Sequence, residues 1–139
     1  IVAADPHEQG PRRALNLGHT FAHAIEHAAG YGTIPHGIAV GVGVVLALEA
    51  SSAWSVSSDP ALTERVVALL GALGLPCALA QLREQWNVRL APDELWNGLA
   101  HDKKGAAGAP EFVLVRAAGE LLLGHGRDRE EVREFLRVR

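Results

Sequence analysis

RRALNLGHTFAHAIEHAAGYGTIPHGIAVGVGVVLAL, residues 12–48, is the stretch that decides the fold of this 139-residue chain. Apolar residues recur at helical spacing before Gly30, which predicts a first helix over residues 14–29. After Pro35 the chain is almost continuously apolar, which predicts a second helix over residues 37–54. Because a helix that is apolar on nearly every side must be covered by others, we expect the second helix at the centre of the domain.

Four of the seven histidines lie in this stretch, and three of them are four residues apart: His19, His23 and His27. On an α-helix this spacing places them along one side, with a drift of about 40° per step. Two imidazoles at positions i and i+4 allow one helix to supply two ligands to a zinc ion. Spacing alone therefore favours His19 and His23 as ligands, with His36 as a third candidate and His27 near the solvent end. The alternative is that all four histidines are structural.

The order LNLGHTFAHAIE, then YG, then HG and AV, resembles the carboxyl-terminal domain of the 3-dehydroquinate synthase family, which belongs to the sugar phosphate cyclases. The family motif is close to LN-x-GHT-x-GHA-x-E, followed by a loop, HGEAV and an apolar helix. VAAD near the start and DKK near residue 103 extend the resemblance, whereas residues 51–100 match only in general character.

The resemblance implies a use of the histidines that differs from the one favoured by spacing. The positions of His19 and His36 bind zinc in the family, and the third ligand is a glutamate of an amino-terminal domain. The position of His23 lies near the substrate and assists proton transfer. The positions that contact the substrate are Arg12, Asn16 and Lys104, with Lys103 as the alternative to Lys104.

The activity that the resemblance implies is that of a zinc- (or cobalt-) and NAD-dependent carbon–oxygen lyase of the shikimate pathway of aromatic amino acid biosynthesis. It converts 3-deoxy-arabino-heptulosonate 7-phosphate into 3-dehydroquinate and inorganic phosphate. The family binds NAD mainly through an amino-terminal α/β domain and is commonly dimeric. This chain has no Gly-rich strand–helix fingerprint for a dinucleotide. We therefore expect residues 1–139 to form the metal- and substrate-binding domain alone, and to be inactive without the other.

Two positions depart from the family pattern. Ala22 stands where glycine is usual and would crowd the substrate side of the helix, and Ile38 stands where glutamate is common and removes a carboxylate near His36. These departures leave open a sister cyclase such as 2-deoxy-scyllo-inosose synthase. Metal-dependent alcohol dehydrogenases of the wider superfamily are a more distant alternative. A non-catalytic helical module for assembly is the alternative from another class, and a pocket formed by the histidines would argue against it.

Several polar residues of the stretch have two interpretations each. Arg12 and Arg13 are either a solvated pair or an anion clamp, and only Arg12 has a matched role in the family. Asn16 is a poor helix former and is either a substrate contact or a partner for a neighbouring turn. Glu26 is either an exposed charge, which we favour, or a carboxylate that orients an imidazole.

The rest of the chain predicts further helices and one hairpin, which gives a mainly α fold. Helices are expected over 59–73, 78–86, 92–100 and 128–136, and a β-hairpin over 112–124. Between them, residues 101–111 read as a loop that carries the two lysines. The helix over 59–73 should bury a stripe formed by Val66, Val67, Leu69, Leu70 and Leu73. Gly37, Gly41 and Gly43 each cost the central helix about 1 kcal/mol relative to alanine, which a close helix contact would explain.

Composition fits one globular domain and excludes some partners. The chain is 48% hydrophobic and 21% charged, with a net charge of −3, so charge gives no reason to expect nucleic acid or an anionic membrane as a partner. Its one cysteine, Cys77, allows no internal disulfide, which is typical of a reducing cytoplasm. The charge-free run from 37 to 48 is too short to span a bilayer.

Overall fold

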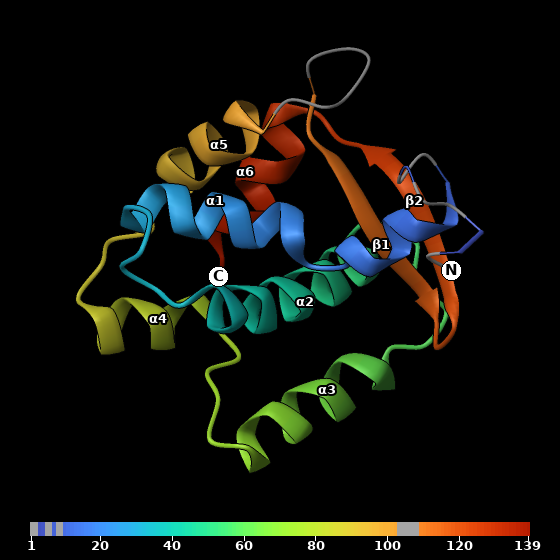
Figure 1. Cartoon of the computed structure of the whole chain (residues 1–139), viewed down its shortest axis with the longest axis horizontal. Coiled ribbons are helices and arrows are strands. Elements are labelled where there is room, and N and C mark those ends of the chain that lie inside the picture. Colours follow the sequence, from blue (N-terminus) through green and yellow to red (C-terminus); the bar gives the residue numbers. More distant parts are fainter. Residues whose placement is uncertain (1–2, 5–6, 8–9, 103–108) are drawn as a thin grey trace.

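The computed structural model describes residues 3–4, 7, 10–102 and 109–139, and its elements are arranged as in Figure 1. A 3-10 helix, η1 (Pro11–Asn16), precedes six α-helices and a hairpin. The helices are α1 (His19–Ala29), α2 (His36–Ala53), α3 (Ala61–Ala72), α4 (Leu79–Trp86), α5 (Pro92–His101) and α6 (Arg129–Arg137), and the strands are β1 (Glu111–Ala117) and β2 (Glu120–Gly126). The predicted mainly α fold with one small antiparallel hairpin is confirmed.

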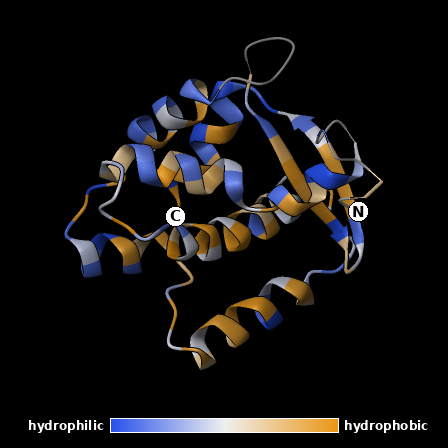
Figure 2. Cartoon of the chain, in the orientation of Figure 1, coloured by the Kyte–Doolittle hydropathy of each residue, from blue (hydrophilic) through white to orange (hydrophobic). Residues whose placement is uncertain are grey.

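The central helix α2 is covered by the other elements, as its composition predicts. α1 lies between α2 and α5, while β1 and α3 pack elsewhere on α2 (Figure 1). Nine of the 18 residues of α2 are buried. By length and a mean hydropathy of 1.5 this helix resembles a membrane span, but a helix buried in a protein core has the same composition. Figure 2 shows the hydrophobic residues running along it.

Two glycines bring α1 and α2 into backbone contact. A Cβ atom on Gly43 would lie 2.2 Å from the carbonyl oxygen of Gly18, so no larger residue fits between the helices. Of the three glycines expected to permit a close approach, Gly43 does so. Gly41 has only a Leu70 methyl at 3.9 Å, and no described atom lies within 4 Å of a Cβ built on Gly37.

The expected continuous helix over residues 14–29 is wrong, because the chain breaks at Leu17 and Gly18. Gly18 has φ of +81°, a left-handed conformation that ends η1 and lets α1 begin at His19. The Gly18 carbonyl accepts the first helical hydrogen bond of α1, from Ala22 N at 2.9 Å, while it packs against Gly43. Apolar periodicity continues across the break, so the pattern alone does not reveal it.

The expected buried stripe on the helix over 59–73 is also wrong. None of the residues that the structure describes in α3 is buried, and Leu69 and Leu73 are 60% and 64% exposed. Val66, Val67 and Leu70 are half-buried. Figure 2 shows that α3 is nonetheless strongly hydrophobic. Its start and stop signals position the helix correctly, but burial depends on neighbours, and α3 packs mainly against α2.

One buried serine fastens the hairpin to α2. Ser51 is fully buried, and its hydroxyl donates to Ala47 O at 2.6 Å and accepts from Val115 N on β1 at 2.9 Å. The strand register shifts between Val115 and Ala117, next to this contact. Because β1 is fixed on α2 in this way, its first residue, Glu111, lies beside the amino end of α1.

Candidate active site and metal centre

Three imidazoles meet where α1 and α2 begin. The ring centres of His19 and His36 are 5.4 Å apart, and those of His19 and His23 are 6.0 Å apart. The His23 and His36 rings are 6.2 Å apart. His19 and His23 share one side of α1, as their spacing predicts, and His36 is the first residue of α2.

The turn between the helices brings His36 back to α1. Gly30, at φ of +86°, donates to His27 O, and Thr33 N donates to Gly30 O at 3.0 Å. Ile34 then inserts into the core with 2% exposure. Since the turn is closed and anchored in this way, His36 is held opposite the first turn of α1.

Each of the three rings has an oxygen atom next to its Nδ1. The partner of His19 is Leu17 O at 3.4 Å, the partner of His23 is an Asp102 carboxylate oxygen at 2.9 Å, and that of His36 is a Glu26 carboxylate oxygen at 3.1 Å. Carbonyl and ionised carboxylate oxygens only accept hydrogen bonds, so Nδ1 donates in each contact. In the neutral rings Nε2 then carries the lone pair that binds a metal or a proton.

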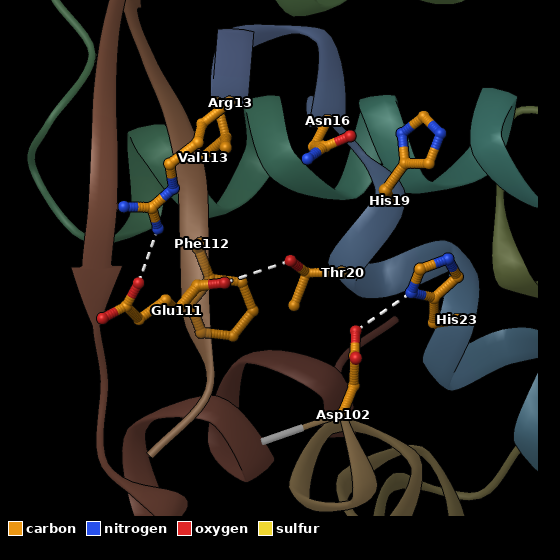
Figure 3. A pocket seen from close by; sticks show the side chains of 9 residues that line it. All are labelled: Arg13, Asn16, His19, Thr20, His23, Asp102, Glu111, Phe112 and Val113. Carbon is orange, nitrogen blue, oxygen red and sulfur yellow. Dashed lines mark hydrogen bonds and ion pairs between the residues drawn. The ribbon is translucent and has the colours of Figure 1, made fainter. Parts of the chain in front are cut away.

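A cleft of 180 Å³ opens beside two of these rings (Figure 3). Nine residues line it: Arg13, Asn16, His19, Thr20, His23, Asp102, Glu111, Phe112 and Val113. Arg13 donates to Glu111 at 2.6 Å, and the Thr20 hydroxyl donates to Glu111 O at 3.0 Å. These contacts join η1, α1 and β1 around one space that is rich in donors and acceptors.

The structure brings together most of the site residues expected from the sequence. Asn16, His19 and His23 line the cleft, and the ring of His36 stands beside the two histidines. Arg12 is not among the described residues that line the cleft, so its role stays a prediction. Lys103 and Lys104 lie outside the described residues.

His27 lies away from the other three histidines, near the expected solvent end. Its ring neighbours are Tyr31, at 6.1 Å between ring centres, and His101 of α5, at 5.2 Å. The four-residue spacing continues from His23 to His27, but the drift around the helix turns His27 toward α5.

Glu26 is not the exposed charge that we favoured. Its side chain is only 12% exposed, and it contacts His36. Glutamate is common in the family at the position of Ile38. In this chain Glu26 of α1 provides a carboxylate to His36 instead. Ile38 packs against the core instead. Ala22 is fully buried among core residues, next to Gly43. The expectation that it crowds the substrate side of the helix is therefore wrong.

Sequence reasoning assigned no role to three polar residues of the cleft, Thr20, Asp102 and Glu111, and gave Arg13 no role matched in the family. Asp102 had a signal, since it is the first residue of the DKK motif. Glu111 had none, because it lies 98 residues after Arg13 and only the fold brings the two together.

The donor set fits two ligands of a zinc site. His19 and His36 have the ring spacing and the Nδ1 partners that leave two Nε2 atoms available. Within residues 3–4, 7, 10–102 and 109–139, no group of three or more His, Cys, Asp or Glu side chains could hold a metal ion. A tetrahedral site built on these two histidines therefore needs a further ligand.

Comparison with known proteins identifies the family. The family model described as 3-dehydroquinate synthase C-terminal matches residues 1–105, about three quarters of the chain. The chain belongs to this family. It is 39% identical over 140 residues to the 3-dehydroquinate synthase of Rhizobium rhizogenes, and the matched region covers 99% of this chain and 36% of that protein. It is 40% identical over 141 residues to that of Teredinibacter turnerae, with 100% and 36% covered. The chain thus spans about a third of the length of these relatives.

A solved structure supports the fold of this 3-dehydroquinate synthase C-terminal domain. It is 2-epi-5-epi-valiolone synthase from Streptomyces hygroscopicus subsp. jinggangensis, with NAD+ and Zn2+ bound. The TM-score is 0.72 at 23% identity, over 97% of this chain and 35% of that one. Because the identity is low, this likeness shows the shared helical fold alone.

Proposed function

We propose that this chain is the metal- and substrate-binding part of a 3-dehydroquinate synthase. The reaction converts 3-deoxy-arabino-heptulosonate 7-phosphate into 3-dehydroquinate and inorganic phosphate, in the shikimate pathway. The observation that carries the proposal is the meeting of His19, His23 and His36 beside a polar cleft, in a chain about 40% identical to curated synthases. A helical assembly module would have no need for this convergence.

In this proposal two histidines hold zinc and a third handles protons. His19 and His36 bind through Nε2, while a glutamate of the proposed amino-terminal domain is the third ligand. Zinc, when bound, supplies a Lewis acid that polarises substrate oxygens. His23 lines the cleft and accepts or returns a proton at a substrate hydroxyl through Nε2.

The remaining site residues bind the substrate. Asn16, on the wall of the cleft, supplies both a donor and an acceptor for substrate hydroxyls. Arg12 offers a guanidinium to a carboxylate or phosphate, and Lys104, or Lys103 in its place, offers an ammonium to the phosphate. Together they hold an anionic sugar-acid phosphate with its reacting carbons beside His23.

NAD and the rest of the protein enter through the length of the relatives. The chain spans 36% of the Rhizobium rhizogenes enzyme, so we propose that an amino-terminal domain supplies the NAD site and the third zinc ligand. The fold neighbour contains NAD+ and Zn2+, which supports this pair of cofactors for the family's architecture. We further propose a cytoplasmic homodimer.

The test is phosphate release by this chain joined to the amino-terminal domain of the same protein. We expect inorganic phosphate and 3-dehydroquinate from the seven-carbon sugar-acid phosphate, and only when NAD and zinc are both present. A protein that binds NAD and zinc but releases nothing from this substrate would be a sister cyclase acting on another sugar phosphate. Failure to bind either cofactor would reject the enzyme altogether.

A further inference from the structure

We propose that Asp102 is a positioning residue for His23: it accepts the Nδ1 proton, fixes the ring, and so leaves Nε2 as the nitrogen that accepts a proton. This inference deepens the proposed function and rests on it. Asp102 touches neither metal nor substrate in this account. It acts through the orientation and the tautomer of the imidazole beside it.

The contact joins two distant parts of the chain with good geometry. His23 Nδ1 and the Asp102 carboxylate oxygen are 2.9 Å apart across a separation of 79 residues (Figure 3). Their side chains are 41% and 32% exposed, so the pair is partly shielded from solvent. Both residues line the cleft, and both also line a second recess with Tyr31, Gly98 and His101. The pair therefore forms part of the wall between the two hollows.

The helix that carries Asp102 gives no local reason for a carboxylate at this position. Asp102 is the C-cap residue of α5, where the helix dipole disfavours a negative charge. Its backbone N–H donates to Gly98 O, which any residue except proline would do. The hydrogen bond from His23 explains the carboxylate of Asp102, because a donor at this position offsets the unfavourable effect of the helix dipole.

The packing of α5 on α1 sets the distance between the two groups. A Cβ on Gly98 would lie 2.8 Å from Ala24 Cα and 2.9 Å from Ala24 O, so the two backbones touch there. Ala24 follows His23, and Asp102 comes four residues, about one helical turn, after Gly98. The close crossing of the two helices thus holds the end of α5, and with it Asp102, next to the His23 ring.

The chemical consequence concerns the tautomer. A neutral imidazole can carry its proton on either nitrogen, and the hydrogen bond at one nitrogen selects the tautomer. A carboxylate at Nδ1 requires the proton there and leaves the lone pair on Nε2, which can then accept a proton. Without Asp102 the ring is free to rotate and to adopt the other tautomer. In that tautomer Nε2 carries a proton and does not accept one.

The first measurement is spectroscopic and needs no activity. Long-range 1H–15N correlation spectra of the intact chain report the tautomer of each histidine, at a pH about two units above the ordinary imidazole pKa of about 6.5. We expect His23, assigned with a His23→Gln variant, to be protonated at Nδ1. Asp102→Ala should shift it toward the Nε2-protonated form. Asp93→Ala, which removes an exposed carboxylate from the same helix, should not. An unchanged His23 tautomer in Asp102→Ala would overturn the proposal.

The second measurement is kinetic, on the chain joined to its amino-terminal domain. Asp102→Ala should lower kcat about tenfold to a hundredfold, by analogy with lost partners of metal-bound histidines, with little change in KM. Asp102→Asn keeps an oxygen at the same place and should recover part of both kcat and the Nδ1 tautomer. A loss in Asp102→Asn equal to that in Asp102→Ala would overturn the proposal. If the unchanged protein releases no phosphate, the proposed function fails, while the spectra still decide whether Asp102 positions His23.

Discussion

At the scale of single residues, the three imidazoles are each held by an oxygen atom from a different part of the chain. Leu17 and Glu26 lie close in sequence to their histidines, whereas Asp102 reaches His23 from α5. A histidine pair alone is a weak sign of a metal site. Partners at Nδ1 make it a stronger one, because they fix the ring before the ion arrives.

Replacing His19 tests whether this histidine is a zinc ligand. His19→Ala, in the chain joined to its amino-terminal domain, should abolish stoichiometric zinc binding, because one of three protein ligands is lost. The matched control is His27→Ala, which removes an imidazole from the same helix and should retain the zinc. Metal content by atomic absorption after dialysis decides, and zinc retained by His19→Ala would sink the ligand assignment.

Replacing Glu26 tests the carboxylate behind His36 in the same two-domain protein. Glu26→Ala should weaken zinc binding about tenfold to a hundredfold, because the ring loses the acceptor that orients it. Affinity is measured by competition with a chromophoric chelator. Glu120→Ala, an exposed carboxylate paired with Arg116 on the hairpin, is the control. Equal affinities in the two variants would mean that Glu26 does not orient His36.

Replacing Ser51 tests the link between the central helix and the hairpin. Ser51→Ala leaves the buried Val115 N–H without its acceptor, which should cost about 1–3 kcal/mol of the free energy of unfolding. Urea denaturation measures the loss. Ser52→Ala changes an exposed neighbour on the same helix and should stay within about 0.5 kcal/mol of the unchanged chain. Equal stabilities of the two variants would argue against the contact.

At the scale of elements, two backbone contacts build the site. Gly18 on Gly43 places the start of α1 against α2, and Gly98 on Ala24 places α5 against α1. The first contact positions His19, and the second positions Asp102. Helix crossings of this kind fix side chains more firmly than loops do, because the packed backbones leave little room to move.

Widening the α1–α2 crossing should disturb both stability and the site. Gly43→Ala places a Cβ 2.2 Å from a backbone oxygen, so we expect a loss of about 1–3 kcal/mol despite the better helix propensity of alanine. No described atom lies within 4 Å of a Cβ on Gly37, so Gly37→Ala should be neutral or gain up to about 1 kcal/mol. Thermal unfolding of both variants measures the contrast. A stabilised Gly43→Ala would show that the helices are not in backbone contact.

His125, near the end of β2, should make the free energy of unfolding depend on pH. Burial, and then the charge of Arg127, lower the pKa of His125 below its usual value of 6.5, and His125 Nε2 accepts from Arg127 at 3.0 Å. As the pH falls, the unfolded chain therefore takes up a proton on His125 at a higher pH than the folded chain does. The contribution of His125 to stability is fully present above about pH 6.5 and falls as the pH drops below that value.

His125→Gln keeps a polar side chain at this position and cannot take up that proton. Unfolding free energies from urea titrations, compared between pH 7.5 and about pH 5.5, should fall less for this variant than for the unchanged chain. The difference between the two curves isolates His125 from the carboxylates, which titrate in both proteins. Parallel curves would contradict the prediction.

At the scale of the whole molecule, the metal centre that we propose is incomplete within the described residues. The two histidines that we propose as ligands lie together beside a cleft, while no group of three possible ligands is found among the residues that the structure describes. The chain spans about a third of the length of its relatives, and we propose that the third ligand and the NAD site belong to an amino-terminal domain like the one expected for the family.

The chain alone should therefore bind zinc weakly. Equilibrium dialysis of this chain, with and without the amino-terminal domain, measures the difference. We expect stoichiometric zinc only with both parts, because two ligands leave a tetrahedral ion half-coordinated by protein. Tight stoichiometric binding by the chain alone would mean that the third ligand lies within residues 1–139.

The sequence by itself determined the helices, the hairpin, the histidine-bearing stretch and the family. Helix positions follow from local periodicity and from breakers such as Gly30 and Pro60, and the four-residue histidine spacing places two rings on one side of α1 whatever surrounds it. Only the tertiary structure decided the break at Gly18 and the exposure of α3. The partners of His23 and His36 were decided there too. Each of these depends on which elements pack against one another, and a local pattern holds no information about a contact between residues 79 positions apart.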